Sequence, residues 1–129
     1  MKKYLLTLLL LLSSIFGFSQ SRIGFSEREI RSEFSSETFK VAFTDKGIKY
    51  IYFTGDYLTA MYFLNSENIC THCIAIPNNV GTLNGLVQLY NKEYVIINDT
   101  NWKYYTGAVI IYITLTEFNG IPTFVYTTN

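Results

Sequence analysis

The sequence predicts an α+β fold in which an antiparallel sheet of about eight strands carries two helices on one face. Three observations predict it: two segments with helical periodicity, short runs rich in β-branched and aromatic residues, and turn signals between those runs. The composition agrees, because 17% of the residues are aromatic and only 16% are charged. Such a balance is typical of a sheet-rich globular domain and not of a disordered chain.

Residues 1–19 have the layout of a secretory signal peptide. Lys2 and Lys3 follow Met1, residues Leu5 to Leu12 are apolar except for Thr7, and the small residues Gly17 and Ser19 suit a cleavage site. The apolar core of about a dozen residues is shorter than the about 20 that a membrane-spanning helix needs. We therefore expect residues 20–129 to form one exported domain, periplasmic or extracellular, with no membrane span after cleavage. An uncleaved amino-terminal anchor is the alternative.

Charge limits the partners of that domain. Removing the signal peptide removes Lys2 and Lys3, which leaves 8 basic residues against 10 acidic ones, a net charge of −2. The basic residues are scattered along the chain, whereas nucleic-acid binding needs a basic stripe to neutralise phosphates. We expect no nucleic-acid partner.

The first helix is predicted in the stretch G-F-S-E-R-E-I-R-S-E-F. Ser26 suits the N-cap and Glu29 follows three residues later, which is a capping box. Phe25 before the cap and Ile30 inside the helix form the hydrophobic staple that accompanies such a box. Phe34 follows Ile30 by four residues and extends the same apolar face.

A second helix is predicted over T-L-N-G-L-V-Q-L-Y-N-K. Leu83, Leu86, Val87 and Tyr90 recur at the spacing of one helical face. Thr82 is the candidate cap in this segment.

The remaining segments read as strands divided by turns. D-K-G at 45–47, T-G-D at 54–56, N-S-E-N at 65–68 and F-N-G at 118–120 are turn signals. The predicted strands are Phe39–Thr44, Ile48–Thr54, Tyr57–Leu64, Ile69–Ile76, Tyr94–Asn98, Trp102–Thr106, Ala108–Thr116 and Ile121–Thr127.

The two halves of the domain align with each other, as repeat units of about 24–77 and 79–128. F-K-V-A-F lies over Y-V-I-I-N, I-K-Y-I over W-K-Y-Y, and I-C-T-H-C-I-A over I-P-T-F-V-Y-T. Identity between the halves is low, so chance similarity of two β-rich segments is the alternative. A repeat predicts two α-β-β-β-β units that share one sheet.

This layout resembles the tandem units of β-lactamase-inhibitor-protein-like domains and, more remotely, the saddle of the TATA-binding protein. The resemblance covers residues 20–129 and lies in the order of elements, without a specific motif. The DNA-binding property of the saddle is not implied, because the basic residues are missing. A signal that ends in S-Q is also similar to those of small exported proteins of uncharacterised function in Bacteroidota.

The stretch C-T-H-C at 70–73 holds both cysteines and the single histidine of the chain. A thioredoxin-like redox pair needs its first cysteine at a helix N-terminus, whereas a β-rich run surrounds Cys70 and Cys73. A disulfide requires Cα atoms within about 7 Å, and residues three apart in a strand are about 10 Å apart unless a turn intervenes.

A zinc site needs four ligands where this stretch offers three, and haem attachment needs the histidine after the second cysteine. We favour a strand with free or buried thiols. Alternation would then place Cys70 and Cys73 on opposite faces of the sheet. A redox or disulfide role for the pair remains the alternative.

The sequence predicts no catalytic constellation, cofactor or metal. A serine-histidine-aspartate arrangement would have to use His72, and no nucleophile-elbow sequence is present. The acidic residues that could pair fall in or beside predicted turns, where solvation explains them. We therefore expect a protein without enzymatic activity, and a thiol-disulfide redox protein is the alternative.

The tyrosines suggest a binding surface on the sheet. A solvated sheet face normally alternates polar residues outward, and tyrosine is favoured at interfaces because it buries area while keeping a polar tip. We expect an aromatic-rich face that holds a protein, peptide or envelope component, or a second copy of the chain. A loop or a chain terminus that covers the face is the alternative. The candidate residues are Lys49, Ile51, Tyr62, Lys103, Tyr105 and Tyr112.

Overall fold

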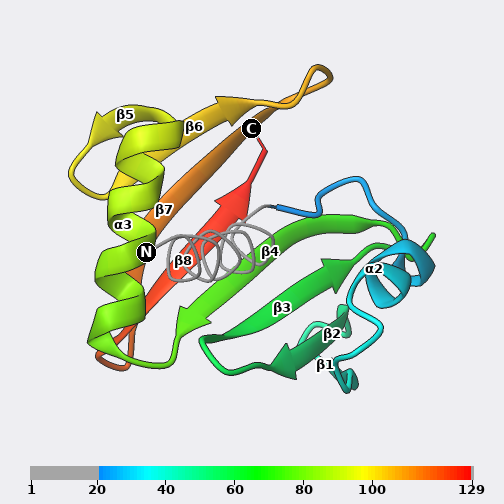
Figure 1. Ribbon diagram of the computed structural model, residues 1–129. Helices are drawn as coiled ribbons and strands as arrows, with labels where there is room; N and C mark the ends of the chain where they lie inside the picture. Colours follow the sequence, from blue (N-terminus) through cyan, green and yellow to red (C-terminus); the bar gives the residue numbers. More distant parts are fainter. Residues whose placement is uncertain (1–20, 129) are drawn as a thin grey trace, which may run out of the picture.

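The computed structural model describes residues 21–128, and the predicted signal peptide lies outside this range. The described chain contains two helices and eight strands (Figure 1). The helices are α2 (Glu27–Glu33) and α3 (Val80–Glu93). The strands are β1 (Lys40–Phe43), β2 (Lys49–Thr54), β3 (Leu58–Leu64), β4 (Cys70–Pro77), β5 (Val95–Asn98), β6 (Asn101–Tyr105), β7 (Ile110–Phe118) and β8 (Ile121–Thr127).

The strands form one antiparallel sheet in the order β1-β2-β3-β4-β8-β7-β6-β5, which confirms the predicted fold class. Each half contributes one helix followed by four strands that pair with their neighbours in sequence. The halves meet where β4 pairs with β8, with Ile74 opposite Val125. The order of elements therefore occurs twice, while descent of the halves from one repeat stays a prediction.

Both helices lie on the same face of the sheet, each over its own half (Figure 1). Ile30 of α2 and Tyr90 of α3 are fully buried against that face. One row of directly paired residues crosses all eight strands beneath them, because paired residues of an antiparallel sheet share a face. The row consists of Val41, Ile51, Tyr62, Cys73, Tyr126, Ile113, Trp102 and Ile96.

Local signals explain how the elements begin and end. Ser26 caps α2, and the reciprocal bonds with Glu29 that define a capping box are both present, as predicted. The cap of α3 is Asn79 and not Thr82, since the Asn79 side chain accepts the Thr82 backbone N–H at 2.8 Å. Asparagine at this position satisfies an otherwise unpaired donor of the first turn, and it places the cap three residues earlier than predicted.

The hairpin between β7 and β8 shows the same agreement at a turn. Phe118 pairs with Ile121, so Asn119 and Gly120 form a two-residue loop. Both have positive φ, 53° and 80°. Asparagine followed by glycine is the preferred pair for this loop, because both positions require left-handed backbone.

None of the described helices is long and apolar enough to cross a membrane.

Candidate functional site

The sheet face opposite the helices is an uncovered surface within the described residues. Its central row also crosses all eight strands, and neither helix packs on this side. Half of the row is apolar or aromatic, although a solvated sheet face is normally polar. The row consists of Lys40, Tyr52, Met61, Ile74, Val125, Thr114, Asn101 and Asn98. We call this side of the sheet the open face.

An aromatic cluster occupies the half of the open face formed by β2, β3 and β4. The Tyr50 ring lies 5.0 Å from Phe63 and 5.8 Å from Tyr52, measured between ring centroids. Phe63 stacks on the His72 imidazole at 4.3 Å with an angle of 9° between the planes. Tyr50, Tyr52 and His72 are half-buried, so their edges remain available to a partner. This cluster was not among the predicted site residues.

Three of the predicted site residues lie on the other half of the open face. Lys103 pairs directly with Tyr112 across β6 and β7. Tyr105 lies two residues beyond Lys103 on the same strand and is 70% exposed. A small apolar depression of about 190 Å³ adjoins them, lined by Val95, Lys103, Tyr104, Tyr105 and Ile110. The structure therefore places Lys103 and Tyr105 at a depression that fits an apolar side chain, with Tyr112 next to Lys103 on the neighbouring strand.

The predicted placement of Ile51 and Tyr62 on the open face is wrong. They pair with each other on the helix side, where Ile51 is 0% exposed and Tyr62 is 2% exposed. Tyr62 packs on Phe34 of α2, with the rings nearly parallel at a centroid distance of 6.1 Å. Burial raises the pKa of Tyr62, because the phenolate would lose its hydration. Both residues belong to the core.

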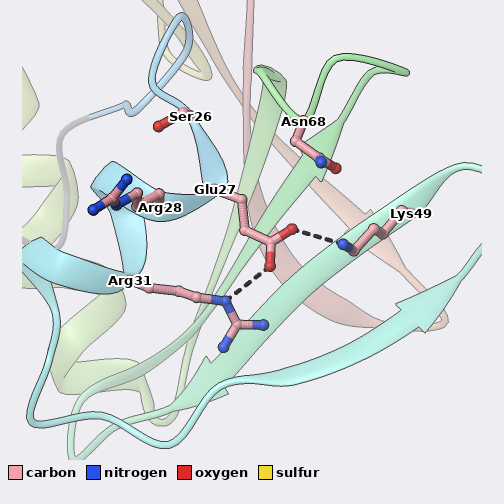
Figure 2. Close-up of a pocket in the computed structure, with 6 residues that line it drawn as sticks. All are labelled: Ser26, Glu27, Arg28, Arg31, Lys49 and Asn68. Carbon is pink, nitrogen blue, oxygen red and sulfur yellow. Dashed lines mark hydrogen bonds and ion pairs between the residues drawn. The ribbon is translucent and has the colours of Figure 1, made fainter.

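Lys49 is also on the helix side and not on the open face (Figure 2). Its ammonium lies 2.7 Å from Glu27 Oε1, and Arg31 Nε lies 2.9 Å from the other oxygen of the same carboxylate. Burial opposes ionisation of Glu27, but the hydrogen bonds from Lys49 and Arg31 lower its pKa overall. These residues line an open depression of about 470 Å³ with Ser26, Arg28 and Asn68. Lys49 therefore holds α2 against the sheet.

A shift of one residue between the halves explains these errors. The alignment placed Lys49 over Lys103, yet Lys49 faces the helices while Lys103 faces away from them. Side chains alternate along a strand, so a shift of one residue moves a whole strand to the opposite face. The residues that were missed, among them Tyr50 and Tyr52, alternate with Ile51 along the strand and therefore lie on the face opposite to it. A signal for them was present, because the alternate positions of β2 are all aromatic or threonine.

The predicted alternation of the two cysteines is wrong as well. The register between β3 and β4 shifts after Phe63, which pairs with His72 while Leu64 pairs with Cys70. Thr71 is therefore the extra residue of a β-bulge, which breaks the alternation. Cys70 and Cys73 both point into the core, 1% and 3% exposed, with their sulfur atoms 3.5 Å apart. The strand and the buried thiols were predicted, and the bulge was not.

His72 makes the open face sensitive to acid. Burial lowers its pKa below the ordinary value, because the imidazolium would lose hydration beside the Phe63 ring. The unfolded chain then binds the proton more readily, so stability is complete above the unfolded pKa of about 6.5 and falls as the pH decreases below it. We expect the thermal midpoint to fall more between about pH 7 and pH 5 in the natural protein than in His72→Gln. Equal decreases in calorimetry would contradict this assignment.

The open face offers contact area and few groups for chemistry. Its strand positions include the cations Lys40 and Lys103 and no carboxylate. Among residues 21–128 no three histidine, cysteine or acidic side chains gather where they could hold a metal ion. The open face has an aromatic patch at one end and a lysine beside an apolar depression at the other. No protein-family model, curated protein or solved structure matches the chain.

Proposed function

We propose that this protein is an exported binding module that holds a protein, a peptide or an envelope component on the open face of its sheet. The observation that carries the proposal is the row of apolar and aromatic side chains that crosses β2, β3, β4 and β8 without a helix above it. Extended apolar patches on soluble proteins usually mark interaction sites. Tyrosine-rich surfaces bind well because few rotatable bonds are immobilised for a large contact area.

The charges on this face favour a particular partner chemistry. Lys40 lies at the β1 edge and Lys103 lies on the opposite half of the sheet, beside the depression near Tyr105. A partner with an apolar or aromatic stretch and a carboxylate at one end would match both features, since rim charges set orientation and rate of association. The half-buried Tyr50, Tyr52 and His72, which surround the buried Phe63 ring, would supply most of the contact area.

A thiol-disulfide exchange enzyme fits the structure less well. Such enzymes place an exposed, reactive cysteine at a helix N-terminus. Cys70 begins strand β4 here, and both sulfurs are buried in the core. A protein substrate could not reach either sulfur without displacement of the chain that packs on them.

Comparison of matched variants tests the binding proposal. The natural protein, Tyr52→Ser/Tyr112→Ser and Phe43→Ser are immobilised and exposed to periplasm and medium of the exporting cell. Phe43 is an exposed aromatic residue on the helix side of edge strand β1, so it controls for loss of a surface ring. We expect a species that the natural protein and Phe43→Ser retain and the double variant loses at least about tenfold, since two interface aromatics contribute about 1 kcal/mol or more each. Equal retention by all three proteins would refute the open face as the site.

A further inference from the structure

The β-bulge at Thr71 places two thiols where a bond between them can form. Cys70 Sγ and Cys73 Sγ are 3.5 Å apart, and both side chains lie on the helix side of β4. A disulfide bond is about 2.05 Å long, so the sulfurs must approach each other by about 1.5 Å. Rotation of the two side chains can supply much of this movement, because the bulge has already brought both onto one face.

The segment Ser21–Phe25 covers this pair of thiols. Its backbone forms hydrogen bonds with both backbone groups of Cys70. Gly24 N–H donates to the Cys70 carbonyl and Cys70 N–H donates to the Phe25 carbonyl, each at 2.8 Å. The Ser21 hydroxyl lies 3.8 Å from Cys73 Sγ. Within residues 21–128, the chain that precedes α2 therefore packs directly on the two cysteines.

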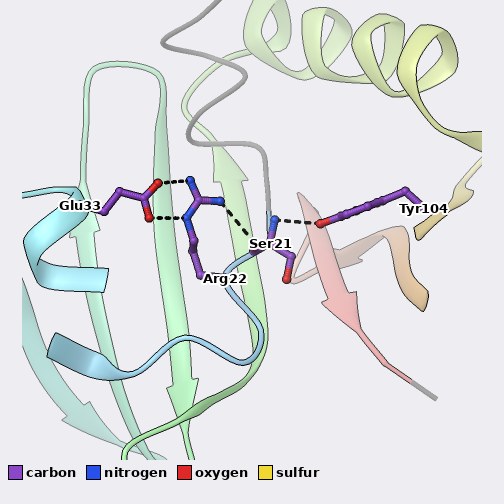
Figure 3. Close-up of polar contacts among 4 residues, drawn as sticks. All are labelled: Ser21, Arg22, Glu33 and Tyr104. Atoms are coloured by element: carbon purple, nitrogen blue, oxygen red, sulfur yellow. Dashed lines mark hydrogen bonds and ion pairs between the residues drawn. The ribbon is translucent and has the colours of Figure 1, made fainter. Parts of the chain in front are cut away.

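An ion pair between a buried arginine and a partly exposed carboxylate fastens the covering segment (Figure 3). The Arg22 guanidinium binds the Glu33 carboxylate through two nitrogens, at 2.6 and 2.8 Å, and its central carbon lies 5.2 Å from the Phe34 ring centre. The Arg22 side chain is only 5% exposed. Ser21 N–H also donates to the Tyr104 hydroxyl at 3.1 Å, so both halves of the sheet hold this segment.

We propose that Cys70 and Cys73 are a modification site: when the segment Ser21–Phe25 opens, a disulfide-bearing oxidant converts the two thiols to an intrachain disulfide, which the closed segment then shields from reductants. Predicted export places the chain in a compartment where such oxidants are present. Cys73 is the first attacking thiol, because Cys70 Sγ donates its proton to the His72 carbonyl at 3.4 Å while Cys73 Sγ lies beside the Ser21 hydroxyl. Burial opposes its ionisation, but hydrogen bonds from Cys70, the Arg22 backbone and Ser21 lower its pKa overall. The hydrogen bond to Cys73 and burial raise the pKa of Cys70.

The reaction is two successive exchanges. The Cys73 thiolate attacks one sulfur of the oxidant, breaks its disulfide, forms a mixed disulfide and releases one thiolate. Cys70 then loses its proton and attacks the Cys73 sulfur, which forms the Cys70–Cys73 bond and releases the second thiolate. The two thiol protons are taken up by the two leaving groups. The protein loses two electrons, and the oxidant is reduced to two thiols.

Oxidised glutathione is the probe for the bond itself. Reduced protein of residues 20–129 is incubated with it, quenched in acid, denatured and treated with N-ethylmaleimide, and its intact mass is measured. We expect a loss of about 2 Da without any adduct, the signature of completed exchange. Cys70→Ser should stop with one glutathione attached to Cys73. Maleimide uptake at both cysteines, two attached glutathiones or disulfide-linked dimers in the natural sequence would each overturn the proposal.

The shielding is tested by the rate at which dithiothreitol reduces the oxidised native protein. Arg22→Met removes the ion pair that fastens the segment Ser21–Phe25. Glu33→Gln weakens the same ion pair more mildly and replaces Arg22→Met in the experiment if that variant does not fold. We expect about tenfold faster reduction in Arg22→Met, which corresponds to about 1.4 kcal/mol of easier opening. Arg28→Met, at an exposed position of α2, is the matched control. Equal rates in Arg22→Met, Glu33→Gln and Arg28→Met would contradict the role of the segment.

Discussion

Replacing Tyr62 by alanine is expected to lower the free energy of unfolding by about 3–5 kcal/mol, the usual cost of removing a buried aromatic ring. The ring is 2% exposed and packs among Phe34, Phe39 and Phe53, which join α2 to the sheet. Its loss would leave a cavity that these neighbours fill only in part. Urea unfolding followed by tryptophan fluorescence measures the change, with Trp102 as the single tryptophan.

Tyr112→Ala is the matched control for this experiment. Tyr112 has the same side chain on the opposite face of the sheet, where it is half-buried. We expect a cost of about 1 kcal/mol or less, because removal of a half-buried ring leaves no enclosed cavity. Equal costs in the two variants would contradict the assignment of the faces. The result matters for binding studies, since Tyr62→Ala would impair capture through unfolding and not through the site.

The elements of the fold could be predicted because their signals are local. The capping box of Ser26 and Glu29 starts α2 as predicted, and the pair Asn119 and Gly120 closes the last hairpin. Hydrophobic periodicity places Leu86 and Tyr90 in the core beneath α3. Each of these decisions depends on a few neighbouring residues, and tertiary packing does not overrule them.

Which residues of a strand face the helices was harder to predict than where the strand lies, because the choice of face depends on register. In β2, Lys49, Ile51 and Phe53 read equally well as an open face or a core face from the sequence alone. Tertiary contacts decide it: Glu27 of α2 binds Lys49, and Phe34 of the same helix packs on Phe53. Aligning the two halves added an error of one residue, which turned half of the predicted site toward the helices.

The cysteines show a second limit of strand periodicity. Regular alternation separates residues three apart onto opposite faces, and this rule holds from Cys73 to Pro77. One extra residue at Thr71 cancels it, so Cys70 joins Cys73 in the core. Bulges have weak sequence signals, since they arise from how the partner strand and the covering segment pair. Here Cys70 pairs with Phe25 and Gly24 as well as with Leu64.

Site-specific photo-cross-linking in the source cell tests the binding account most directly. A benzophenone amino acid replaces Tyr52 or Tyr112 on the open face, and Phe43 or Lys92 as controls. Phe43 is exposed on the helix side of the sheet and Lys92 is exposed on α3. Tyr52 and Tyr112 occupy opposite halves of one continuous surface, so a partner that spans the open face, as we propose, would contact both.

The account predicts one cross-linked species shared by positions 52 and 112 and absent from positions 43 and 92. The cross-linking yield should depend on which face of the sheet a position occupies and not on how exposed it is. Phe43 separates the two effects, because it is more exposed than either tyrosine but lies on the helix side. Cross-links confined to positions 43 and 92, or none at positions 52 and 112, would contradict the open face as the binding surface.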